Sequence, residues 1–149
     1  MNLSRLYTMT VERVDGKRRG YVIAAIREGD GVAALLCADE NESEFFIEPD
    51  GIVRMSDSIV YRTEGKRQGR RGTMRLNVPC YNEYGRFMGY IEDYVMKQLT
   101  LKTCVIAGKN YPAERICVGD IALLKSKNDT AAAIAAKDMF LEAVVGGCQ

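Results

Sequence analysis

The sequence predicts an all-β protein that contains an internal repeat and ends in one α-helix. As far as about residue 125, short β-prone runs alternate with turns rich in Gly, Asp and Asn. The stretch VDGKRRGYV at 14–22 is nearly repeated sixty-nine positions later as EYGRFMGYI at 83–91. Beyond residue 126 the spacing of apolar residues changes from two to about 3.6, which is the period of a helix.

In the first half, turn residues separate β-rich runs of four to seven residues. Glycine supplies positive φ, and Asp or Asn caps its own turn, so this pattern predicts hairpins. The expected turns are Gly29-Asp30-Gly31, Asp39-Glu40-Asn41-Glu42 and Pro49-Asp50-Gly51. In the second half the runs are GYIEDYVMK, LTLKTCVIAG, ERICV and DIALLK, divided at Gly108-Lys109-Asn110 and Gly119-Asp120.

The two copies of the repeat share a Gly-x-x-x-Gly spacing. The first glycine, Gly16 or Gly85, is expected to close a tight turn. The second, Gly20 or Gly89, is expected to begin a strand where a side chain would collide with a neighbouring backbone or bend the sheet. The same spacing can cradle a phosphate, but that use requires a helix after it, whereas β-prone residues follow here. The pattern therefore favours the turn interpretation.

Composition argues against most enzyme chemistry. The 149 residues include no histidine, which removes the commonest general base and metal ligand. The five cysteines form no CxxC pair, so Cys37, Cys104 and Cys117 are interpreted as small buried hydrophobes. Glu92 with Asp93, and the acidic loop of Glu40, Glu42 and Glu44, lack convergent geometry or calcium spacing. We expect no catalytic residue, no metal and no cofactor.

Charge and hydropathy limit the partners and the location. A formal net charge of +1 gives no global attraction to nucleic acid or to anionic membranes. The sequence shows no apolar run of about eighteen residues and no secretory signal at its start. The expectations are a cytoplasmic protein with no membrane association and no DNA binding.

The opening LSRLYTMTVERVDGKRRGYVIAAI and the ending YPAERICVGDIALLK resemble a PRC-barrel unit. This small β-barrel is known from the photosynthetic reaction centre H subunit and from a ribosome-maturation factor. The resemblance appears twice, over about residues 3–62 and 73–125, although the first copy has IVRMSDSIV where Gly-Asp is expected. It implies two tandem β-barrels with internal pseudo-twofold symmetry, at 1–65 and 73–127, joined by a basic linker at 66–72. It also implies an interaction or assembly module without shared catalytic residues.

The segment between the two copies concentrates positive charge. YRTEGKRQGRRGTMR holds six of the 21 basic residues and one of the 20 acidic residues, Glu64. Its basic residues could contact RNA phosphates, or they could form a solvated linker or a clasp onto the acidic stretch 39–44. The alternation of Tyr81, Tyr84, Tyr90 and Tyr94 favours packing over base stacking. The candidate contact residues are Arg62, Lys66, Arg67, Arg70, Arg71 and Arg75.

The tail predicts an amphipathic helix at 128–146. Asn128 or Ser126 offers an N-cap, the alanine run from Ala131 has high helix propensity, and Gly146-Gly147 provides the stop. An apolar face of this size must be covered, either by capping a barrel end or the seam between the units, or by pairing with a second chain or a partner. The residues proposed for an interface are Phe140, Leu141, Val144 and Val145.

Taken together, these features predict a non-enzymatic protein-interaction or assembly module that binds a protein partner or self-associates. The alternative is an RNA- or ribosome-associated factor that uses the basic segment from Arg62 to Arg75.

Overall fold

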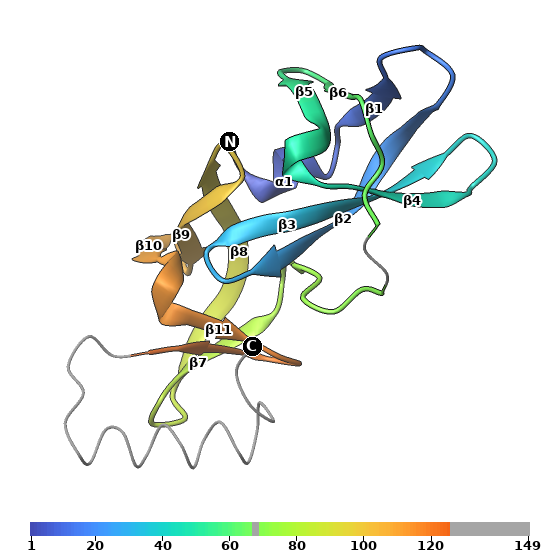
Figure 1. The fold of residues 1–149 in the computed structure, drawn as a ribbon. Helices are drawn as coiled ribbons and strands as arrows, with labels where there is room; N and C mark the ends of the chain where they lie inside the picture. The colour runs from blue at the N-terminus through green and yellow to red at the C-terminus, as the bar shows by residue number, and fades with distance from the viewer. Residues whose placement is uncertain (67–68, 126–149) are drawn as a thin grey trace. The chain divides into compact units, whose positions relative to one another are not determined.

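The structure, a computed structural model, describes residues 1–66 and 69–125 (Figure 1). It is mostly β, as the sequence predicts, and the chain divides into two compact units. The first unit comprises Met1–Met74 with Gln98–Thr100, and the second comprises Arg75–Lys97 with Leu101–Gln149. The predicted helix at 128–146 lies outside the described residues.

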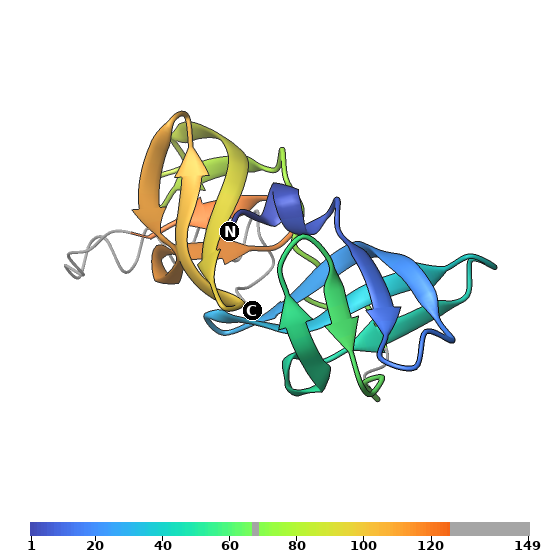
Figure 2. The same ribbon diagram turned by 90° about the horizontal axis from the view of Figure 1, so that it is seen from above.

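The first unit is a sheet of six strands in the order β4-β3-β2-β1-β6-β5. All neighbouring strands are antiparallel except β1 and β6, which run parallel. Seen from above, these blue-to-green strands curve around one another (Figure 2). The elements are α1 Leu3–Leu6, β1 Thr10–Arg13, β2 Arg19–Glu28, β3 Gly31–Asp39, β4 Glu44–Ile47, the 3-10 turn η1 Pro49–Gly51, β5 Ile52–Met55 and β6 Ile59–Tyr61.

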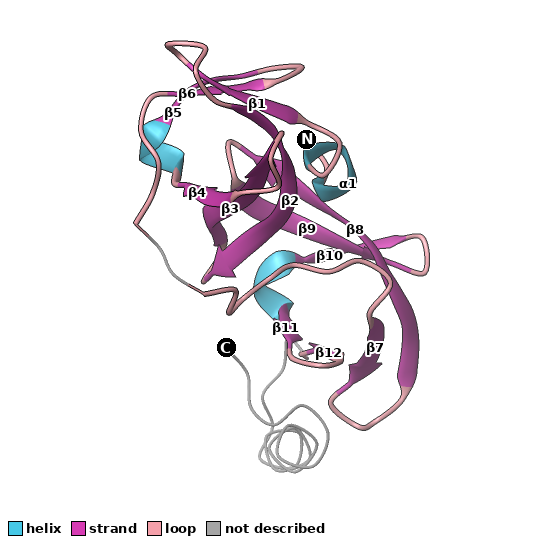
Figure 3. Cartoon of the chain, turned by 90° about the vertical axis from the view of Figure 1, so that its right-hand side faces the viewer, coloured by secondary structure: helices cyan, strands magenta, loops and turns pink. Residues whose placement is uncertain are grey.

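Two of the three turns predicted in this half join hairpins, and the third does not. The Gly29 turn connects β2 to β3, and the turn after Asp39 connects β3 to β4. Pro49-Asp50-Gly51 instead forms η1, which leads from β4 into a strand that pairs with β6 rather than with β4 (Figure 3). Proline fixes φ near −65°, which suits the first position of a helical turn, so the hairpin prediction was wrong here.

The second unit repeats this strand order. Its sheet runs β11-β12-β7-β8-β9, with β10 paired to β9, and β12 lies parallel to β7. The strand β10 begins at Lys109, so the turn predicted at 108–110 is shorter than expected. The elements are β7 Pro79–Asn82, β8 Phe87–Lys97, β9 Thr100–Ile106, β10 Lys109–Pro112, the 3-10 turn η2 Ala113–Arg115, β11 Ile116–Val118 and β12 Ala122–Leu124.

The correspondence between the units extends to individual hydrogen bonds. Directly after β6, Arg62 N donates to Gly51 O at 2.8 Å, where Gly51 is the last residue of η1. Directly after β12, Lys125 N donates to Arg115 O at 2.8 Å, where Arg115 is the last residue of η2. The internal repeat read from the sequence therefore extends well beyond the two glycine motifs.

The glycines of the repeat are required for two different reasons. Gly16 and Gly85 have φ of 72° and 82°, the left-handed conformation expected in a tight turn. A Cβ added at Gly20 would lie 2.1 Å from Ala38 O in the neighbouring strand, so close backbone approach excludes any side chain. At Gly89 the cause is conformational, since its φ is 126°. The prediction of a side-chain collision is thus met most directly at Gly20.

The strands do not close into two barrels. In the described residues they connect into one 12-stranded sheet whose order begins at β11 and ends at β5. In the first unit, single hydrogen bonds partly bridge the gap, because Gly65 N donates to Phe46 O of β4 at 2.7 Å. The expectation of two closed barrels is therefore met only as a β-rich fold with repeated strand order.

Candidate interaction surfaces

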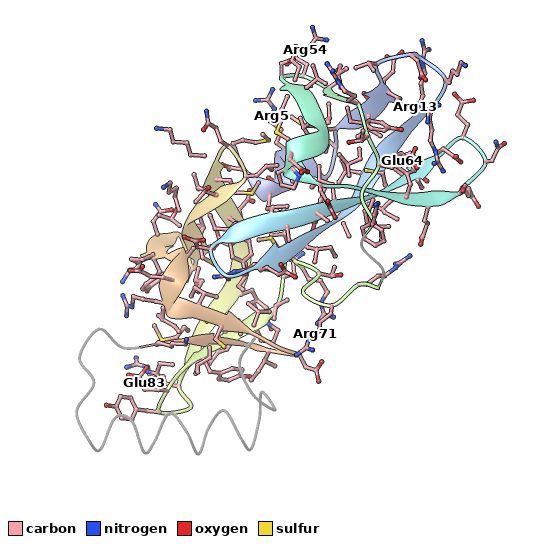
Figure 4. All side chains as sticks on the ribbon, viewed as in Figure 1. Arg5, Arg13, Arg54, Glu64, Arg71 and Glu83 are labelled. Atoms are coloured by element: carbon pink, nitrogen blue, oxygen red, sulfur yellow. The ribbon has the colours of Figure 1, made fainter. Side chains whose placement is uncertain are left out.

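The predicted basic segment is exposed but does not form one surface. Arg62, Lys66, Arg70 and Arg71 are exposed residues of the first unit, and Arg71 projects from the loop before β7 (Figure 4). Arg75 is exposed and belongs to the second unit. Arg67 lies outside the described residues.

The charges of this segment divide into paired and unpaired groups. Arg70 forms an ion pair with Glu44, which is the contact expected of a clasp onto the acidic stretch. By contrast, Arg62, Lys66 and Arg75 form no ion pair with any residue of the described ranges 1–66 and 69–125. The clasp interpretation therefore applies to Arg70, while Arg62 and Lys66 keep their charges available to a partner.

The single acid of the segment, Glu64, takes part in an ion cluster that the sequence did not reveal. Arg18 Nη1 lies 2.7 Å from Glu64 Oε1, and Arg18 Nη2 lies 3.1 Å from Asp39 Oδ2. Arg13 Nη1 lies 3.6 Å from Glu64 Oε2, and Figure 4 shows both residues in the same part of the first unit. The Arg18 guanidinium also lies 4.1 Å from the centroid of the Phe45 ring. These half-buried contacts join β2, β3 and β4 to the chain after β6.

Asp39 is the acidic anchor of this cluster. Its Oδ1 accepts hydrogen bonds from Ser43 N and Asn41 N, both at 2.9 Å, which fixes the turn between β3 and β4. These amides, together with the nearby Arg18, hold the pKa of the Asp39 carboxyl below its usual range. The turns before β2 and after β3 flank an open cavity of about 360 Å³. It is lined by Gly16, Lys17, Arg18, Arg19, Asp39, Glu40 and Asn41.

Beneath the cluster lies a buried tyrosine whose hydroxyl makes no hydrogen bond. Tyr61 is fully buried, and its ring packs 5.7 Å from that of Phe45. Among the described residues its hydroxyl is the one buried side-chain oxygen or nitrogen without a hydrogen-bond partner. Burial, reinforced by Glu64, raises the pKa of Tyr61 to about 12. The hydroxyl is therefore neutral at physiological pH.

The second unit carries an exposed aromatic cluster. Phe87 of β8 contacts Tyr81 at 5.5 Å and Tyr90 at 5.3 Å between ring centroids, both in edge-on geometry. Phe87 and Tyr90 are 48% and 55% exposed, and Tyr84 in the adjoining turn is 65% exposed. Tyr94 is buried as expected, but the prediction of packing was wrong for Tyr84 and Tyr90. We call Tyr84, Phe87 and Tyr90 the aromatic cluster.

The sequence held a signal for this cluster that periodicity alone does not reveal. Tyr84, Phe87 and Tyr90 occupy the positions of the repeat that Asp15, Arg18 and Tyr21 occupy in the first unit. Two charged residues are thus replaced by aromatic ones at equivalent places. Where Arg18 is drawn inward by Glu64 and Asp39, Phe87 remains half exposed.

Other predicted features are less informative. Cys37, Cys104 and Cys117 are buried in strands, as expected, and burial raises the pKa of the Cys37 thiol to about 12. Within the described ranges, no group of three or more Cys, Asp or Glu side chains could hold a metal ion. No helix in this part of the chain is long and apolar enough to cross a membrane. Phe140, Leu141, Val144 and Val145 lie outside the described residues.

No protein-family model matches the chain, and no curated protein shows significant similarity to it. The class of protein therefore rests on the fold and on the surfaces described above.

Proposed function

We propose that this protein is a non-enzymatic interaction or assembly module built from two PRC-barrel-type units, and that the aromatic cluster binds its protein partner. The observation that carries the proposal is the exposure of Tyr84, Phe87 and Tyr90 on neighbouring parts of one strand and turn. Tyrosine and phenylalanine are enriched in protein interfaces, where few such residues supply most of the binding energy.

The contacts within the cluster support a binding role. Because Phe87 packs edge-on against both Tyr81 and Tyr90, its ring is held in place before any partner arrives. A preorganised apolar surface loses little conformational entropy on association. The Tyr90 hydroxyl, on a half-exposed ring, can also bond to a partner backbone.

The repeated architecture supports the resemblance to PRC barrels. In each unit the first strand pairs in parallel with the last, and a 3-10 turn precedes the final hairpin. Thiol chemistry has little support, because burial raises the pKa of Cys37 to about 12 and that of Cys80 to about 11.

The test is partner capture with the full chain from its own cells. A Phe87→Ser/Tyr90→Ser variant should lose the proteins that copurify with the wild type, while its melting temperature stays close to that of the wild type. Tyr21→Ser is the matched control, because Tyr21 holds the position of Tyr90 in the first unit and is 47% exposed. Equal capture by the wild type and the double variant would rule out this surface as the binding site.

The second candidate is RNA association through the basic segment. It is favoured by the exposed charges of Arg62 and Lys66, which form no ion pair within the described ranges. Affinity for single-stranded RNA should then fall steeply with salt, and Arg62→Gln/Lys66→Gln should weaken binding and flatten the slope by about two contacts. Arg70→Gln is the control, since Arg70 already pairs with Glu44. Unchanged binding by the double variant would reject this candidate.

A further inference from the structure

The β11–β12 hairpin of the second unit is buried on both faces. All three residues of β12 are buried, with exposures of 0% for Ala122, 0% for Leu123 and 4% for Leu124. In β11, Ile116 and Cys117 are 3% and 2% exposed. Successive residues of a strand point to opposite faces, so one face packs into the core of the unit and the other face is also covered.

The corresponding hairpin of the first unit shows that this burial does not follow from the architecture. By their places in the β5–β6 pairing, Val53 corresponds to Cys117 and Val60 corresponds to Leu123. Val53 is 51% exposed and Val60 is half-buried, whereas Cys117 and Leu123 are almost completely buried. Cys117 and Leu123 form a small apolar cluster of their own, with Ile121 packed against it. We call this cluster the outer face of the second unit.

The covered region extends to the turn between β7 and β8. Glu83 lies directly after β7 and is only 4% exposed, although the next residue, Tyr84, is 65% exposed. Asn82, which precedes Glu83, pairs with Leu124 at the end of β12. Whatever covers the outer face therefore also reaches the point where the chain leaves β12.

We propose that the predicted amphipathic helix at 128–146 docks in the same molecule on the outer face of the second unit. The chain continues from Leu124 into 24 residues, 126–149, so the helix begins beside the face that has to be covered. A helix of about sixteen residues is roughly 24 Å long, enough to cross the roughly 15 Å width of three adjacent strands. The short connection also gives the helix a high effective concentration at this face.

The chemistry of the two surfaces is complementary. The outer face offers Cys117, Ile121 and Leu123, all apolar, and the helix offers the apolar stripe that includes Phe140 and Val144. Such a helix is marginal in water unless its stripe is covered, so docking stabilises both elements. This surface is separate from the aromatic cluster and does not depend on the proposed function.

The experiment measures how fast a maleimide labels Cys117 in the full chain, in the presence of a reductant. Phe140→Ser/Val144→Ser should uncover the outer face and speed the labelling of Cys117 by at least about tenfold, as expected when a local cover opens. Cys104 is fully buried in the same unit and should stay unlabelled, which shows that the unit remains folded. Lys137→Ser/Glu142→Ser, on the polar side of the helix, is the matched control and should match the wild type.

Three results would overturn the proposal. The first is slow labelling of Cys117 in the Phe140→Ser/Val144→Ser variant, because another element would then cover the face. The second is fast labelling in the control variant. The third is labelling of wild-type Cys117 that accelerates on dilution, because the cover would then come from a second copy of the chain.

Discussion

Arg18 lies over the face of Phe45, with its guanidinium carbon 4.1 Å from the ring centroid, while its nitrogens contact Glu64 and Asp39. One side chain thus joins an aromatic ring to two carboxylates from different parts of the first unit. Because the guanidinium fork supplies several donors at fixed angles, lysine cannot reproduce these contacts.

Arg18→Ala should lower the free energy of unfolding by about 1–3 kcal/mol, since it leaves two half-buried carboxylates without their cation. Arg18→Lys should lie between Ala and the wild type. Arg19→Ala serves as the control, because the Arg19 pair with Glu12 is exposed and such pairs contribute about 0–1 kcal/mol. Urea denaturation at neutral pH measures all three. A loss no larger for Arg18→Ala than for Arg19→Ala would contradict the structural role of the cluster.

The depressed pKa of Asp39 predicts a loss of stability in acid. A carboxyl whose pKa is lower in the folded state stabilises the fold above its unfolded value, near 4, and loses that contribution as the pH falls through the folded value. Asp39→Asn keeps an oxygen acceptor for Ser43 N but loses the charge that faces Arg18. The variant should therefore be less stable than the wild type at pH 7, with the difference shrinking below about pH 4. Parallel stability curves from pH 7 to pH 3 would refute this account.

Removing the hydroxyl of Tyr61 should not destabilise the protein. Because this buried hydroxyl lacks a partner, Tyr61→Phe should be neutral or stabilising by up to about 1 kcal/mol. Tyr7→Phe is the matched comparison, because the Tyr7 hydroxyl donates to Met74 O and accepts from Ala25 N at 3.2 Å. Its loss should cost about 1–3 kcal/mol. Thermal melting of the two variants would reveal opposite signs, and a clear loss in Tyr61→Phe would disprove the assignment.

The close approach at Gly20 predicts strong intolerance of any side chain. A Cβ there would lie 2.1 Å from Ala38 O, so Gly20→Ala must push β2 away from β3 and should cost more than about 3 kcal/mol. Gly31→Ala is the control, because the nearest atom to its added Cβ is Leu99 O at 3.7 Å. Gly31→Ala should stay within about 1 kcal/mol of the wild type. Comparable unfolding midpoints for the two variants would argue against the close contact.

Local signals predicted most of the strands, and the failures have identifiable causes. Hairpins at Gly29 and Asp39 were predictable because these residue types favour specific turns. The turn between β8 and β9 carried no such signal, since Gln98 and Leu99 adopt φ of 50° and 64° without being glycine. Leu99 is also 7% exposed, so its apolar side chain favours this position despite the backbone conformation.

The surfaces were harder to predict than the strands because they combine distant residues. The ion cluster joins Arg13, Arg18, Asp39 and Glu64, and no local pattern indicates that they meet. Exposure of the aromatic cluster was also hidden, because alternation in a strand shows which residues share a face but not which face is solvated. Comparing the two repeats position by position would have indicated it.

The parallel pairing of β1 with β6, and of β7 with β12, has a consequence for the order of folding. Val11 meets Ile59 across forty-eight positions of chain, and Cys80 meets Ala122 across forty-two. Contacts of such long sequence separation form late, because the loop between them must first be closed. During synthesis the first unit therefore cannot complete its sheet until β6 has emerged, and the second must wait for β12. Until then each unit exposes an unpaired strand edge to other nascent chains.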